Sequence, residues 1–92
     1  MKKNDLYMEK NTSVFYLVTE PSNMRMLFDS SVAPVSVPEC IQYSPEIKLK
    51  CKVYVDLYNT ERFTPVRSGG CIINTDLFNK FLEMLIKGDT NE

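Results

Sequence analysis

Polar and apolar residues alternate almost without fault from Glu46 to Tyr58. This period of two predicts a half-buried β-strand, because successive side chains of a strand point to opposite sides of its sheet. The apolar positions are Ile47, Leu49, Cys51, Val53, Val55 and Leu57. The remaining positions are Lys48, Lys50, Lys52, Tyr54, Asp56 and Tyr58. A strand with one apolar side needs a covering layer, so the pattern predicts a sheet packed against another element.

The covering layer is predicted at the C-terminal end. Asn74 or Thr75 can cap a helix, with Asp76 in the first turn and a stop at Gly88. Apolar residues recur there at helical spacing, at Leu77, Phe78, Phe81, Leu82, Leu85 and Ile86. We expect this helix to lie across the Ile47–Leu57 side of the sheet. Its core or dimer contacts are predicted to be Phe78, Phe81, Leu82 and Leu85.

The N-terminal half supplies weaker patterns. Residues 1–12 are polar and predict a loose arm or a short edge strand. Residues 14–19 are β-branched and aromatic and predict a strand. Residues 24–29 fit a second strand of a hairpin better than a helical turn. Residues 30–45 contain three prolines, which forbid a helix and confine any strand to a sheet edge, so we expect an extended connection.

The segment after the long strand contains two further short strands. A turn at residues 59–61 precedes a return strand at 62–66, and a last strand follows at 71–73. We therefore predict an α+β fold: a small antiparallel sheet of about four to five strands with one C-terminal helix on one face. We assign residues 1–92 to a single domain, made of an arm (1–12), strands and a Pro-rich connection (13–45), a strand–strand–helix unit (46–88) and a polar tail (89–92).

Composition argues against catalysis. The chain has no histidine, the commonest general base and metal ligand, and its three cysteines have no framework spacing. We expect no metal, no cofactor and no enzymatic activity, with Cys51 and Cys71 acting as small buried hydrophobic residues. No signal peptide or membrane-spanning run is visible, which predicts a cytoplasmic protein (or a nuclear one in a eukaryotic host) that is not secreted. A core this small favours a homodimer.

The polar side of the long strand suggests a function. Its lysines could neutralise the phosphates of an extended single strand, and its tyrosines could stack on bases. Residues 47–70 hold five basic and two acidic side chains, although the whole chain has a net charge of −1. The predicted nucleic-acid contacts are Lys48, Lys50, Lys52, Tyr54, Tyr58, Arg62 and Arg67. Alternating lysines also protect exposed strands from aggregation, so a solvated face remains the alternative.

A resemblance supports the first interpretation. Three stretches carry it: Lys52 to Leu57, then Pro65, Arg67 and Gly70, then Ile73-Asn74 followed by Phe78. Together they resemble the positive-cofactor-four family of transcriptional coactivators over about residues 47–87. The resemblance implies a four-stranded antiparallel sheet with a helix, a homodimer that pairs its helices, and single-stranded DNA held across the sheets and loops. It would place the chain in transcription or replication.

A second function class stays open. The near-neutral charge and short length equally fit a protein–protein interaction module, such as a small viral or phage accessory factor that docks on a host or polymerase protein. Burial of Lys48, Lys50 and Lys52 would favour this alternative. The Ser68-Gly69-Gly70 segment fits either a tight turn or a backbone contact to phosphate, and the turn is the more common use.

Overall fold

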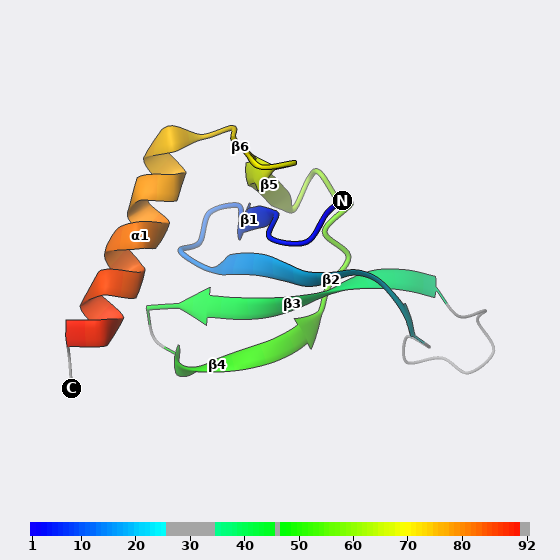
Figure 1. Ribbon diagram of the computed structural model, residues 1–92, viewed down its shortest axis with the longest axis horizontal. Coiled ribbons are helices and arrows are strands. Elements are labelled where there is room, and N and C mark those ends of the chain that lie inside the picture. The colour runs from blue at the N-terminus through cyan, green and yellow to red at the C-terminus, as the bar shows by residue number, and fades with distance from the viewer. Residues whose placement is uncertain (26–34, 46, 91–92) are drawn as a thin grey trace.

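The computed structural model describes residues 1–25, 35–45 and 47–90, without the side chains of 22–25, 35–36, 47–50 and 87–90. It contains one six-stranded antiparallel sheet and one helix, which confirms the predicted α+β class with more strands than expected. Figure 1 shows the strands stacked in the order β4-β3-β2-β1-β5-β6, with the helix to one side. The elements are β1 (Leu6–Glu9), β2 (Phe15–Arg25), β3 (Val35–Ser44), β4 (Ile47–Tyr54), β5 (Phe63–Ser68), β6 (Cys71–Ile72) and α1 (Thr75–Thr90).

Strand β1 lies inside the sheet, between β2 and β5. The expectation of a loose arm or edge strand at residues 1–12 was therefore wrong. Leu6 is buried among residues that α1 covers, while the next residue, Tyr7, packs on the opposite side of the sheet. Four residues are too few for an alternation of polar and apolar side chains to be recognised, and this strand is covered on both sides. The polar composition of the segment therefore concealed the strand.

Strand β3 is also internal, between β2 and β4, although it contains the buried residue Pro38. This position contradicts the prediction that the prolines confine the segment to a sheet edge. The pairing with β2 shifts register between Glu20 and Asn23, and Pro38 has no paired residue there. A proline lacks the amide proton that regular pairing needs, so it is tolerated at such an irregularity. The Pro38 carbonyl still accepts a hydrogen bond from the Val55 amide at 3.4 Å.

The connection from β4 to β5 crosses the sheet instead of forming a hairpin. Strands β3, β2 and β1 separate the two strands that it joins, so residues 62–66 do not return along β4. The predicted turn at Asn59 does form, since its side-chain oxygen accepts the Glu61 amide at 3.1 Å and its carbonyl accepts the Phe63 amide at 3.1 Å. Leu57 anchors this crossover and is only 2% exposed.

The sheet carries a core on each side. On the crossover side, Leu57 and Phe63 pack with residues of β2 and β3, namely Tyr16, Val18 and Cys40. On the helix side, the buried residues are Leu6, Phe15, Val66 and Phe81. The prediction that the helix covers the apolar side of β4 is therefore wrong, because Val53 packs on the opposite side of the sheet from the helix. It follows β6 after a short connection and packs on the helix-side core, which is formed by residues of β1, β2 and β5 together with Tyr43 of β3.

Helix α1 begins as predicted. The Asn74 side-chain oxygen accepts the Leu77 amide at 3.1 Å, which confirms Asn74 as the N-cap. The helix continues to Thr90, beyond the stop expected at Gly88. Phe81 meets the rings of Phe15 and Tyr43 at 5.2 Å each. In the described part of the chain, no helix is both long and apolar enough to cross a membrane.

Candidate functional site

The predicted basic strand presents one described lysine to solvent. The Lys52 side chain is 73% exposed, and its Nζ lies 3.9 Å from Glu39 Oε1. The same carboxylate accepts hydrogen bonds from the Tyr54 hydroxyl and the Thr19 hydroxyl, both at 3.4 Å. Strand β4 also contains Lys48 and Lys50, whose side chains lie outside the described part of the structure. Glu39 therefore partly neutralises the described end of this strand.

The strand pairing fixes the side of the sheet on which these groups lie. Lys52 is paired with Ile41, and Ile41 with Leu17, which packs against the helix-side core. Val53 is paired with Cys40 in the crossover-side core. Lys52 therefore lies on the helix side of the sheet.

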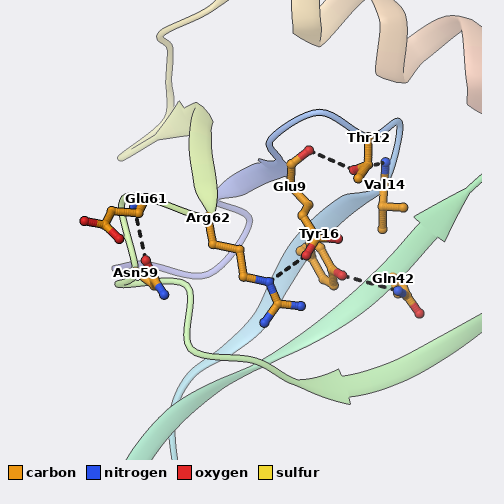
Figure 2. Close-up of polar contacts among 8 residues, drawn as sticks. All are labelled: Glu9, Thr12, Val14, Tyr16, Gln42, Asn59, Glu61 and Arg62. Atoms are coloured by element: carbon orange, nitrogen blue, oxygen red, sulfur yellow. Dashed lines mark hydrogen bonds and ion pairs between the residues drawn. The ribbon is translucent and has the colours of Figure 1, made fainter.

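Arg62 and Tyr58 belong to the crossover on the other side. Figure 2 shows Arg62 reaching towards Glu9, and its Nε donates to Glu9 Oε2 at 2.6 Å. This hydrogen bond raises the pKa of the guanidinium, which also lies 5.0 Å from the centre of the Phe63 ring. Nearby, the Tyr16 hydroxyl accepts a hydrogen bond from Gln42, and burial raises the Tyr16 pKa. Tyr58 is 59% exposed.

Arg67 occupies a third location, on β5, where it is paired with Leu6 of β1 and Ile72 of β6. Within the described part of the structure, the predicted nucleic-acid contacts are thus not gathered on one surface. The described ones occupy the β4 edge, the crossover and the β5–β6 end. The sequence analysis could not predict this separation of the basic residues, because it assumed that β4 and β5 form one hairpin.

Exposed apolar residues lie on β6, on α1 and between them, and the sequence analysis named only Leu82 among them as a contact residue. Four apolar residues there are well exposed: Ile72 (49%), Ile73 (57%), Leu82 (39%) and Ile86 (62%). We call these four residues the helix strip. Leu82, predicted as a core or dimer contact, lies outside the core, whereas Phe81 is buried and Phe78 and Leu85 are partly buried in the helix-side core.

The helix strip follows from helical geometry. Leu82 and Ile86 are four residues apart, so they are neighbours on one face of α1. Ile73 precedes the N-cap, and Phe78 occupies the position with which such a residue packs in a hydrophobic staple. Phe78 is in turn four residues from Leu82. The sequence signal for this surface was the width of the apolar face of α1, which is greater than packing against the sheet alone requires.

The glycine segment is a turn held by a buried acid. Gly69 and Gly70 have φ values of 60° and 84° and connect β5 to β6. The carboxylate of Asp5, which is 1% exposed, accepts the Gly69 amide at 3.0 Å with one oxygen and the Lys2 amide at 3.0 Å with the other. The Gly69 amide is thus already engaged within the protein.

The three cysteines are arranged differently from the expectation. Cys40 is fully buried, whereas Cys51 and Cys71, predicted to be buried, are exposed on the two edge strands. The described residues include no group of three metal-binding side chains. Comparison with known proteins adds no assignment, since no family model, curated protein or solved structure matches the chain.

Proposed function

We propose that this chain is a non-catalytic protein–protein interaction module that self-associates through the helix strip. The observation that carries the proposal is the exposure of Leu82 and Ile86, which are neighbours on α1, and of Ile73 just before the helix. Single exposed apolar residues are common, but a group of neighbouring exposed apolar residues is typical of a contact surface. Burying each of these partly exposed side chains would contribute about 1 kcal/mol.

A second copy is the occupant that fits the composition of the strip. In a twofold contact the same surface meets itself, so it must be self-complementary. An uncharged isoleucine–leucine strip satisfies this condition without repulsion. A chain of 92 residues also has a modest core, which a second subunit would enlarge.

Single-stranded nucleic-acid binding, with the coactivator-like role that the family resemblance implies, is the rival proposal. It is supported by the exposure of Lys52 and Tyr58. Against it, the basic groups Lys52 and Arg62 each lie beside a carboxylate and on different sides of the sheet. A bound strand would have to be contacted from both sides.

The test compares oligomeric state in a dilution series by sedimentation. We expect wild type to be dimeric and the double variant Leu82→Glu, Ile86→Glu to be monomeric, with unchanged circular dichroism. Lys80→Gln is a control: it lowers the net charge by one from an exposed site away from the strip. A monomeric wild type at every concentration would refute self-association.

A binding assay separates the rival. Fluorescence anisotropy with a labelled single strand of about 20 nucleotides should show no change with wild type. Tight binding that collapses between about 50 and 200 mM salt would instead support the nucleic-acid proposal.

A further inference from the structure

The β4 strand forms one outer edge of the sheet. Within residues 1–25, 35–45 and 47–90, β3 is the only strand that pairs with it, along Ile47–Tyr54. An edge strand leaves a row of amides and carbonyls available to another chain, and an extended segment can add there as a further strand. The opposite edge, β6, has only two residues, Cys71 and Ile72, and offers little backbone.

The charge of β4 argues against a second copy as its partner. The strand contains three lysines and no acidic residue. Pairing two copies would bring two lysine-rich strands side by side, and like charges on neighbouring strands are destabilising. The same composition attracts a segment of opposite charge.

Lys52 can be recruited at low cost. Its distance of 3.9 Å from Glu39 is at the limit for an ion pair, and the side chain is mostly exposed. The Glu39 side chain is only 17% exposed, but its carboxylate would keep the hydrogen bonds from the Tyr54 and Thr19 hydroxyls if the ammonium group turned away. The ammonium group could therefore turn towards a carboxylate on an incoming strand.

The two sides of β4 call for different chemistry. Lys52 and Tyr54 lie on one side of the sheet, whereas Val53 lies on the other and packs beside the crossover-side core. A strand added at this edge would extend both faces of the sheet, because its side chains alternate between the two faces. Its alternate residues would meet the lysine side and the apolar side in turn.

From these features we infer that the β4 edge binds an extended segment of a partner protein in which acidic and aliphatic residues alternate. The acidic residues would face Lys52, and the aliphatic residues would lie beside Val53. This inference rests on the proposed protein-binding function but uses a surface separate from the helix strip.

The test uses a labelled, end-blocked peptide with alternating glutamate and valine, beside a scrambled peptide of the same composition. We expect saturable binding of the alternating peptide, and slower hydrogen exchange of the β4 amides but not of the β6 amides. Lys52→Glu should weaken binding about fivefold and favour a peptide with lysine in place of glutamate. Lys80→Glu makes the same charge change on the helix and should have no effect.

Two results would overturn the inference. Equal binding of the scrambled peptide would show charge attraction without strand addition. Failure of the peptide to bind, with Lys52-dependent binding of a single-stranded oligonucleotide, would assign the edge to nucleic acid. The monomeric Leu82→Glu, Ile86→Glu variant should bind the peptide like wild type, so failure at β4 is distinguishable from failure of the helix-strip proposal.

Discussion

The sheet ends in two edge strands that avoid unwanted pairing by different means. β4 is eight residues long and carries three lysines. β6 has two residues, both exposed, and leads at once into α1. Charge limits self-pairing at the long edge, and shortness limits it at the other, two of the ways in which proteins manage exposed edges. The difference suggests that the long edge selects partners by charge, while the short edge contributes only side chains to an apolar contact.

The largest expected difference between regions is in cysteine reactivity, because Cys51 and Cys71 lie on the two edge strands and Cys40 lies in the interior. Burial, with a contribution from the charge of Glu39, raises the pKa of Cys40 to about 12 from 9.0. Thiolate is the reactive form, so at pH 8 the buried Cys40 should react far more slowly than the exposed Cys51 and Cys71. A thiol-specific disulfide reagent, followed by mass spectrometry, would measure this.

The same pKa shift has a stability consequence. Above pH 9 the unfolded chain releases the Cys40 proton while the folded chain retains it, so stability should fall as the pH rises towards 12. In denaturant all three thiols should react alike. Rapid reaction of all three thiols in the folded protein would mean that the reagent reaches Cys40 on β3.

Detaching the helix from the sheet should have the next largest effect. Phe81→Ala removes the ring that meets Phe15 and Tyr43, which should lower the free energy of unfolding by about 3–5 kcal/mol. Urea denaturation would measure the change. Leu82→Ala, at an exposed neighbour, should cost about 0.5 kcal/mol or less under dilute, monomeric conditions. Equal losses would show that α1 packs through another face.

Removing the carboxylate that holds the β5–β6 turn should cost less. Asp5→Ala leaves the Gly69 and Lys2 amides without their acceptor, and we expect a loss of about 2 kcal/mol. Asp5→Asn keeps one acceptor oxygen and should give an intermediate value by thermal denaturation. An Asp5→Ala variant as stable as wild type would contradict the role assigned to this residue.

The smallest expected effect concerns the turn backbone itself. A Cβ atom at Gly70 would meet nothing within 4 Å, so the cost of Gly70→Ala comes from its φ of 84° alone. We expect a loss of about 1–2 kcal/mol, with a smaller one for Gly70→Asn, since asparagine tolerates positive φ better. If Gly70→Ala left the free energy of unfolding unchanged, the turn could adopt another backbone conformation. That result would argue against a turn that fixes the length of β6.

Local patterns predicted the elements with strong periodicity. The strand containing Phe15, the cap at Asn74 and the buried Phe81 follow from side-chain chemistry within a few residues. The β4 alternation was also correct in kind, although the strand ends at Tyr54 and Leu57 belongs to the crossover.

Long-range pairing lay beyond these patterns. Nothing near Leu6 indicates that β1 will pair with β5 on one side and with β2 on the other. Pro38 misled the assignment of β3 because a register shift, not a sheet edge, accommodates it. The candidate site was misread for the same reason: placing Lys52 and Arg62 on one surface required β4 and β5 to be neighbours.

The internal position of β1 has a consequence for how the chain is made. The hydrogen bond between Asp5 and Gly69 joins groups 64 residues apart, and the β5 partner of β1 leaves the ribosome long after β1 itself. Until then, one edge of β1 stays without its final neighbour in the nascent protein. Sheet completion is therefore a late event, and contacts of such long sequence separation are associated with slow folding.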